Sequence, residues 1–444
     1  MKMKKVLALT MAAGLALMSV GCGSKEEHKE QDTQTAEEST DKSGEEEKED
    51  SSSGAVEIEY WSLFGGADGE TMTKMVSKFN EEYAGKIKVN LVTQDWDNYY
   101  TKIKTAILGG QAPDLCNSHD EYVNGLIKEN IIVPIDQACE ETGVKIEFDN
   151  YIDKINQLKS DDKYYAVPMD CLQLMVHYNK SMIAEAGLAD ENGLLTIGDG
   201  VDSFLELVKT LDDKLDVPGF AVATSGSIPM YLFNSLYYQF GGEGKFVSED
   251  GKEWIADQGT ALKALDAYQK INQSGLQNVE NISDLLIQKK VAMVMEGAWQ
   301  MNYLHQNLGD DYGVMSLPKF GDVYKTAIYS HTFVLPNNEQ RSPETTKATL
   351  EFVKWFCENS DQWAEAGSVP AYVPAQDTEL FNSYPMHPYF KDAVEYATPF
   401  TGTAPFALKG SAEINEPLGK LARAEVTPEQ CFEEITQRLT TSFN

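Results

Sequence analysis

The feature that most constrains the fold of this chain is a repeated change of hydrophobic period between residues 56 and 132. Apolar residues first alternate one by one, as in a strand, and then recur every three or four positions, as in an amphipathic helix. The resulting β-α-β-α-β order predicts an α/β fold with mostly parallel strands, helices on both faces of the sheet, and ligands bound beyond the carboxyl ends of the strands. The strand patterns lie at 56–60, 87–91 and 113–116, and the helical patterns at 72–83, 99–107 and 122–132.

A stretch that contains a proline, residues 164–170, indicates how this sheet is connected to the rest of the chain. Its β-rich beginning is followed by Pro168, a second apolar run from Val176 and a helical pattern from Met182. Pro168 lacks a backbone donor and has a fixed φ, so it disfavours the middle of a regular ladder. A strand that passes from one sheet into another explains the pattern, and an edge strand with an ordinary proline is the alternative. The crossing predicts two lobes with a cleft beside Asp170.

The rest of the chain continues the alternation of strands and helices. An aromatic-rich loop and helix spans 224–242, and 289–299 indicates a strand that runs into a turn and a helix. The strand pattern at 332–336 can return to the first sheet. Further helical patterns lie at 203–211, 261–271, 345–357, 414–422 and 432–439.

The amino terminus has the layout of a secretory signal. Residues 1–21 place three lysines before an apolar core that is too short for a comfortable membrane span. Ser19-Val20-Gly21-Cys22 resembles the lipobox of bacterial lipoproteins, although Leu is usual where Ser19 stands. A lipid on Cys22 would hold the protein on a membrane face. An ordinary signal peptide with a chance cysteine is the alternative.

Residues 22–54 contain the candidate lipidated Cys22 and a segment almost free of apolar side chains. Since it has nothing to bury, this segment cannot offset the entropy cost of ordering, and we predict a disordered acidic tether. An acidic interaction tail is the alternative.

Charge and cysteine content exclude several classes of partner. The formal net charge is −33, which opposes binding to nucleic acid because that binding depends on Lys and Arg contacts to phosphates. Apart from Cys22, the cysteines are scattered, without C-x-x-C or metal-ligand spacing. We therefore expect no nucleic-acid partner, no metal and no cofactor, and leave open whether any cysteines pair. These five are Cys116, Cys139, Cys171, Cys357 and Cys431.

A series of short motifs follows in a fixed order along the chain. They are the lipoprotein start, Ala112-Pro113-Asp114-Leu115, His119-Asp120, Tyr165 to Pro168, Tyr178-Asn179-Lys180, Ala186-Gly187-Leu188, Ala292-Met293, Gly297-Ala298-Trp299, Ser316-Leu317-Pro318 and Gly367 to Ala371. In order and spacing they resemble the extracellular solute-binding proteins of ABC importers, and among these the sugar-binding family that includes maltose-binding protein. The resemblance covers nearly all of residues 55–375. One departure is His177, where the family usually has an aliphatic residue; we expect a core or wall histidine there.

The resemblance implies discontinuous lobes joined by a hinge of several strands. Lobe one would comprise 55–167 and 331–372, and lobe two 168–330 and 373–444. It also implies capture of a sugar or short oligosaccharide by lobe closure and its delivery to the transmembrane subunits of an ABC permease. We expect a monomer, anchored through Cys22 on the extracellular face of a bacterial cell membrane.

Candidate binding residues follow the ends of the predicted strands. A neutral sugar needs aromatic rings for its C–H faces, and fixed polar groups for its hydroxyls. The maltose-binding pattern supports Asp120, Tyr231 and Trp299 best, whereas Asp170 is placed only by lying beside the crossing. A helix cap or a solvated face is the alternative for each carboxylate. The predicted ligand-binding residues are Trp61, Phe64, His119, Asp120, Glu121, Asp170, Tyr231, Glu296 and Trp299.

Three other functions are weighed against sugar import. The same fold could bind a polyamine or a polyol derivative, whereas an anionic solute would require Arg or Lys in the cleft, and Arg341, Arg423 and Arg438 lie at no predicted strand end. A glycoside hydrolase requires two opposed carboxylates, and no set of nucleophile, base and orienting residue is evident, so we expect no enzymatic activity. A surface adhesin or sensor remains open.

Overall fold

The computed structural model describes residues 54–442, except 96–97, 153–157, 225, 244–245, 247, 249–253, 277–278, 280, 385–393, 395 and 400–403. The predicted signal peptide, Cys22 and nearly all of the tether lie outside the described residues. No helix of the described part is both long enough and apolar enough to cross a bilayer.

The first sheet contains the three strands predicted near the start of the folded part. β1 runs parallel to β2 and to β3, so their carboxyl ends lie at one edge, as the alternating pattern predicted. β14 lies antiparallel between β3 and β4, which confirms that a late strand returns to this sheet. The order is β2 (Ile87–Thr93), β1 (Val56–Ser62), β3 (Leu115–His119), β14 (His331–Pro336) and β4 (Ile132–Val133), with β7 (Ala166–Pro168) paired to β14.

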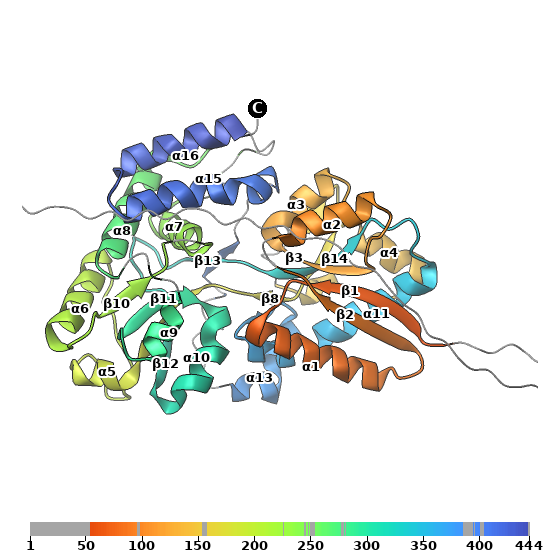
Figure 1. Ribbon diagram of the computed structural model, residues 1–444, viewed down its shortest axis with the longest axis horizontal. Helices are drawn as coiled ribbons and strands as arrows, with labels where there is room; N and C mark the ends of the chain where they lie inside the picture. Colours follow the sequence, from red (N-terminus) through yellow and green to blue (C-terminus); the bar gives the residue numbers. More distant parts are fainter. Residues whose placement is uncertain are drawn as a thin grey trace, which may run out of the picture. The chain divides into compact units, whose positions relative to one another are not determined.

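Helices flank this sheet, as Figure 1 shows. α1 buries Met72, Met75, Val76 and Phe79, the residues whose helical spacing predicted it. It begins at Gly66, earlier than the helical pattern at 72–83 indicated, so only residues 63–65 separate it from β1. The helices are α1 (Gly66–Glu82), α2 (Tyr99–Leu108), α3 (Asp120–Lys128), α4 (Ile135–Thr142), α11 (Pro343–Glu358) and α12 (Ser360–Trp363).

The second sheet is mixed rather than mostly parallel. β10 runs parallel to β11, but β9 is antiparallel to both β11 and β12, because it enters this sheet directly from the first. His177 of β9 is fully buried, and its Nδ1 lies 2.7 Å from the Tyr312 hydroxyl, so it is a core histidine. The order is β10 (Phe220–Val222), β11 (Met293–Gly297), β9 (Leu174–Asn179) and β12 (Tyr312–Ser316).

The helices around the second sheet include one, α7, with every residue buried. Such a helix is apolar on nearly all sides, and here it packs against β9, α8 and α15. The aromatic residues between 228 and 239 are therefore largely core. These helices are α5 (Lys180–Glu185), α6 (Val201–Lys214), α7 (Ile228–Gln239), α8 (Gln258–Gln273), α9 (Ile282–Ile287), α10 (Met301–Leu308), α15 (Ala404–Ala422) and α16 (Pro428–Ser442).

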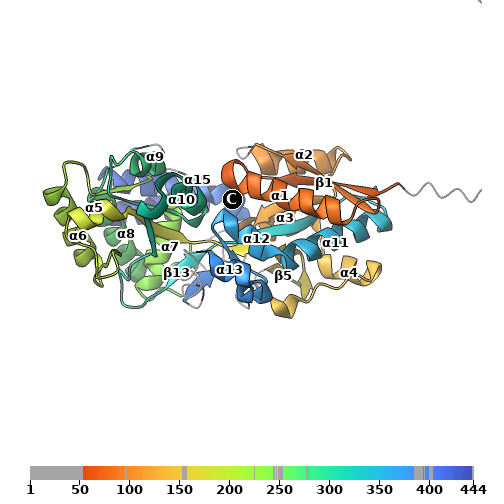
Figure 2. The same ribbon diagram turned by 90° about the horizontal axis from the view of Figure 1, so that it is seen from below.

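Within the described residues, the chain crosses between the two sheets at β7 to β9 and at β13 (Thr326–Ile328) to β14. The chain leaves the first sheet at β7, forms β8 (Asp170–Cys171) and enters β9, so the predicted crossing is present. It returns through β13 to β14, and later β15 (Val369–Pro370) pairs with β8. Figure 2 shows α12 and α13 (Glu379–Ser383) near these segments. The short remaining strands are β5 (Lys159–Ser160), β6 (Lys163–Tyr164) and β16 (Ala397–Pro399).

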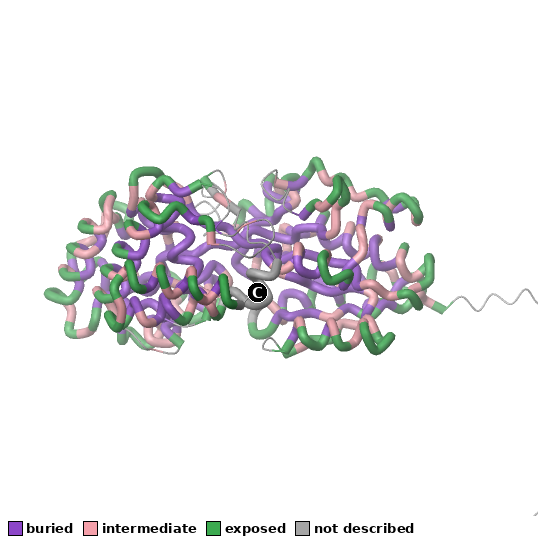
Figure 3. Tube along the Cα trace, turned by 90° about the horizontal axis from the view of Figure 1, so that it is seen from above, coloured by how far each residue is buried: buried purple, intermediate pink, exposed green. Residues whose placement is uncertain are grey.

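One hydrophobic core contains the first sheet and one face of the second, and the other core lies on the opposite face of the second sheet. In Figure 3 the buried trace runs through both sheets and the connecting segments, while exposed residues gather on the outer helices. Two sheets joined by a few strands fit the predicted two-lobed fold, and the residue boundaries of the lobes stay a prediction. The five described cysteines form no disulfide with one another.

Candidate ligand-binding site

A cavity of about 550 Å³ lies where residues from both sheets meet the connecting segments. Its lining comes from the loop and helix after β1, the start of α3, the connecting strands, the start of α7, the turn after β11, and α15. Strand ends therefore contribute as expected for an α/β fold. This volume suits a small solute.

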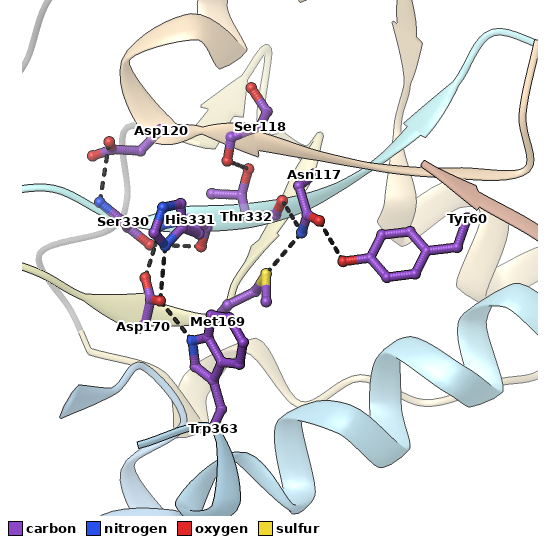
Figure 4. Close-up of polar contacts among 10 residues, drawn as sticks. All are labelled: Tyr60, Asn117, Ser118, Asp120, Met169, Asp170, Ser330, His331, Thr332 and Trp363. Atoms are coloured by element: carbon purple, nitrogen blue, oxygen red, sulfur yellow. Dashed lines mark hydrogen bonds and ion pairs between the residues drawn. The ribbon is translucent and has the colours of Figure 1, made fainter. Parts of the chain in front are cut away.

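The connecting strands contribute Tyr329 and His331 to the lining. The His331 side chain is held from behind by Asp170, whose carboxylate accepts hydrogen bonds from the His331 backbone N–H at 2.8 Å and the Trp363 Nε1–H at 2.7 Å. His331 Nδ1 also lies 2.9 Å from Asp170 Oδ2 (Figure 4). The Phe64 ring meets the His331 ring edge-on, with centroids 4.8 Å apart. Asp170 and Phe64 thus fix the orientation of a cavity residue.

The charge of His331 depends on this contact. Burial would lower the pKa of the imidazole, but the Asp170 carboxylate raises it above the ordinary value by charge and by hydrogen bond. Burial holds the pKa of His119 well below its ordinary value, and the neighbouring His331 adds to this effect. His119 is therefore neutral, and its Nδ1 lies 3.0 Å from the Tyr100 hydroxyl.

The polar run after β3 is divided between a strand end and a helix start. His119 ends β3, whereas Asp120 and Glu121 form the first turn of α3, where acidic side chains complement the helix dipole. Asp120 accepts a hydrogen bond from the Ser330 backbone N–H at 3.2 Å, and its own N–H donates to Ser330 O at 2.9 Å. Glu121 lines the cavity. Of these two adjacent carboxyls, Glu121 therefore lines the cavity, whereas Asp120 is bound to the backbone of Ser330.

Burial makes these carboxyls weak acids. It raises the pKa of Glu121 to about 8, with Asp120 adding to the shift, and the pKa of Asp120 to about 7. Asp68, in the first turn of α1, also lines the cavity. Burial raises its pKa to about 7, although His331 acts in the opposite direction.

Aromatic rings cover the side of the cavity formed by the second sheet. Tyr231 at the start of α7 stacks on Tyr329 with centroids 3.6 Å apart, and meets Trp299 at 6.1 Å and 76°. A Cβ on Gly297 would come within 2.2 Å of the Trp299 indole, so only glycine allows this position of the ring. Asn415 of α15, another lining residue, accepts a hydrogen bond from the Met230 backbone N–H at 3.0 Å.

Four of the nine predicted residues line the cavity, namely His119, Glu121, Tyr231 and Trp299. Phe64, Asp120 and Asp170 pack behind it through His331 and Ser330. Trp61 lies on β1 with its indole N–H donating to Glu59, and Glu296 on β11 accepts from the Gly297 N–H at 2.9 Å. Neither is among the lining residues. No ligand contact is present to test any of the nine, so each stays a prediction.

Several lining residues were not singled out from the sequence. Asp68 lies four residues after Phe64, and Tyr122 directly follows Glu121, so both are close in sequence to predicted binding residues. The Tyr122 ring stacks on the Tyr100 ring, with centroids 3.9 Å apart. Tyr329 and His331 lie just before the strand pattern at 332–336. A prediction that the chain crosses between the sheets a second time at this point would have indicated both residues. Asn415 lies in a helix with no local signal.

The described residues contain no group of three or more His, Cys, Asp or Glu side chains placed to hold a metal ion. The cavity itself offers only two carboxyls and two imidazoles among its described lining, and one of these imidazoles is occupied by Asp170. What the arrangement can do chemically is bind: aromatic rings and hydrogen-bonding groups line the same cavity.

Comparison of the sequence with known proteins identifies relatives of this chain. The sequence model of the bacterial extracellular solute-binding proteins matches residues 65–363. An arabinooligosaccharide-binding protein of Halalkalibacterium halodurans is 22% identical over 346 residues, which cover 74% of each chain.

Two solved structures show the same fold. The GacH receptor of Streptomyces glaucescens, solved unliganded and with acarbose, is 18% identical with a TM-score of 0.73, over 88% of this chain and 98% of that one. UgpB of Mycobacterium tuberculosis, solved with glycerophosphocholine, is 16% identical with a TM-score of 0.73 over the same shares, 88% and 98%. From the match over residues 65–363, this chain belongs to the bacterial extracellular solute-binding proteins.

Proposed function

We propose that this protein is the membrane-anchored, extracellular solute-binding component of an ABC importer, and that it captures a sugar or short oligosaccharide. The observation that carries the proposal is the cavity lining, which combines the aromatic rings of Tyr231 and Trp299 with the polar side chains of His119 and Glu121. The protein delivers its ligand without chemically changing it. It has no nucleotide-binding motif, so the energy for import comes from the ATPase of the permease.

A saccharide fits this lining for two physical reasons. Its C–H faces bury apolar area against aromatic rings, at about 25 cal/mol per Å². Its hydroxyls find acceptors and donors in the carboxyls and imidazoles, and a hydrogen bond to a charged group is stronger than a neutral one. The described arginines are occupied elsewhere: Arg341 donates to backbone carbonyls, and Arg423 and Arg438 pair with glutamates. An anionic solute therefore lacks a partner.

The relatives support a saccharide while leaving a second ligand class to be tested. The Halalkalibacterium relative is named for arabino-oligosaccharides, and the Streptomyces receptor was solved with acarbose. UgpB was solved with glycerophosphocholine, a polyol derivative.

Isothermal titration calorimetry with mono- and oligosaccharides, with glycerophosphocholine alongside, distinguishes the two classes. Chromatography of the same mixtures should return every oligosaccharide intact, and new products would show an enzyme.

Capture involves closure of the two lobes about the connecting strands. A ligand drives closure only by as much as it binds the closed form more tightly than the open form. Tyr231 belongs to the core on one face of the second sheet, and Trp299 packs against that core. Glu121 lies on α3, which flanks the first sheet. A ligand that contacts all three residues therefore bridges the lobes. Small-angle X-ray scattering should show a smaller radius of gyration with saturating ligand, and no change would contradict closure.

Trp299→Ala is expected to weaken saccharide binding by about 30-fold. Removal of one stacked indole face takes away on the order of 80 Å² of apolar contact, or about 2 kcal/mol, and 1.4 kcal/mol corresponds to tenfold in Kd. Gly297→Ala should act in the same direction, since its Cβ displaces the indole. Tyr303→Ala, which removes an exposed ring of α10, is the control and should leave Kd unchanged. Calorimetry measures all three, and unchanged binding by Trp299→Ala would remove this ring from the site.

Cys22→Ala is expected to release the protein from the membrane. A thioether-linked lipid is the only attachment that the proposal provides, and each buried CH₂ contributes about 0.8 kcal/mol to it. Fractionation of cells should find the wild-type chain with membranes and the variant in the medium. Cys139→Ala, within the folded part and only partly buried, is the control and should stay membrane-bound. A variant that remains in the membrane fraction would rule out the lipid anchor.

A further inference from the structure

The acidic groups of the cavity lining have no basic side chain of their own. Asp68 and Glu121 line it, and its described lining contains no Lys or Arg. His331 is the lining group whose pKa is raised, and it is already paired with Asp170 at 2.9 Å. His119 is neutral because burial lowers its pKa. Two carboxyls therefore face the cavity without a cation of their own.

Glu121 holds a specific sign of a missing partner. Its side chain is 6% exposed, and its Oε2 is buried without a hydrogen-bond partner in the described structure. A buried polar atom left in this state costs about 1–3 kcal/mol, and more when the group is charged, so such atoms in native proteins usually have a function. Because Glu121 also lines the cavity, a donor placed there by a ligand would satisfy this oxygen.

Aromatic rings lie close to the same carboxyl. Tyr231 and Tyr329 line the same cavity as Glu121, and their rings stack with centroids 3.6 Å apart. Tyr122, the next residue of α3, lines the cavity as well. An aromatic face attracts a cation within about 6 Å of its centroid, with a free energy of about 0.5–2 kcal/mol. Carboxyls and rings therefore favour the same kind of group.

We propose that the saccharide bound by this protein carries a protonated amine, and that Glu121 accepts its N–H donors while Tyr231 and Tyr329 flank its charge. This inference rests on the proposed function, since it adds an amine to a sugar already placed in the cavity. Without a ligand, burial keeps Glu121 largely protonated at neutral pH, since it raises the pKa of this carboxyl to about 8. An ammonium group supplies an N–H donor and the positive charge that favours the ionised carboxylate, whereas a neutral hydroxyl supplies only the donor. Hydrogen bonds between charged groups are about twice as strong as neutral ones.

The test compares saccharides that differ only in the amine. A panel of mono- to trisaccharides is assembled as triplets: a neutral sugar, its 2-amino counterpart, and the N-acetyl form, which keeps an N–H but loses the charge. Kd values of the purified chain are measured by calorimetry at pH 7. For the triplet that binds best, the amino member is expected to bind at least tenfold more tightly than both others. Glu121→Gln should reduce this preference to within about threefold, because the uncharged amide no longer distinguishes the amino member from the other two.

Glu129→Gln is the matched control, because Glu129 follows the same helix but is exposed. It should retain the full preference for the amine. Neutral members that bind as tightly as amino members, or Glu121→Gln weakening all members equally, would overturn the inference and leave the proposed function intact. If no saccharide binds, the proposed function fails as well. Spermidine is included for that case, since binding of spermidine alone would show a cationic solute without a sugar.

Discussion

Asp170→Ala is expected to lower the free energy of unfolding by about 3–5 kcal/mol, the largest loss of stability we expect from a single substitution. Asp170 is fully buried and joins three parts of the chain that are distant in sequence. Its carboxylate accepts from the His331 N–H and the Trp363 indole N–H, and contacts His331 Nδ1. Removal of one partner of a buried ion pair leaves an uncompensated charge, and losses of this size are typical.

Guanidinium denaturation, with stability extrapolated to zero denaturant, measures this effect. Asp213→Ala is the control: Asp213 is exposed and pairs with Lys209 one turn away, an arrangement that contributes little. Asp170→Asn should lose less than Asp170→Ala, since an amide oxygen can still accept one of the hydrogen bonds. A loss for Asp170→Ala no larger than that for Asp213→Ala would mean that the contacts between Asp170, His331 and Trp363 do not hold the crossing together.

The ligand-free protein is expected to lose stability, on the order of 6 kcal/mol, between pH 5 and pH 8. The pKa values of Asp120 and Glu121 are raised by burial to about 7 and about 8 in the folded state, against about 3.9 and 4.3 in an unfolded chain. The folded state therefore holds these protons more tightly. A raised folded pKa stabilises the protein fully below the unfolded pKa, and this contribution is lost as pH rises through the folded pKa.

One proton difference changes stability by about 1.4 kcal/mol per pH unit. His331 acts with the same sign, because its folded pKa is also raised. Denaturation curves at pH 5, 6, 7 and 8 measure the slope, which Glu121→Gln should reduce and the exposed control Glu129→Gln should leave unchanged. Stability that rises from pH 5 to pH 8 would show that these carboxyls are ionised in the folded protein.

Much of the fold follows from local sequence pattern. The apolar positions of β1 and α1 are the ones whose periodicity predicted a strand and a helix, and the stretch around Pro168 does cross from one sheet to the other. The direction of β9 could not be read in the same way. An alternating pattern shows that a strand is present but carries no information about the direction of its neighbours, and the second sheet is mixed.

The site was predictable only where a motif adjoined a strand end. Glu121 and Trp299 were found in this way, and both line the cavity. Trp61 shows the limit of this reasoning. It lies at the same edge of the first sheet as the start of α3, yet its indole N–H donates to Glu59, and it is not among the lining residues. Position along a strand restricts which edge a residue reaches, but packing of neighbouring side chains decides where its ring lies.

By itself, the sequence determined the α/β class, the crossing at Pro168 and the membership of the solute-binding family, because hydrophobic period and short motifs are local properties. Only the tertiary structure decided that Asp170 supports His331, 161 residues away, and that Asp68, Glu121, Tyr231 and Tyr329 surround one cavity. The physical reason is that these contacts form between elements brought together by sheet pairing across the connecting strands, and their burial, with the pKa shifts that follow, exists only after that pairing.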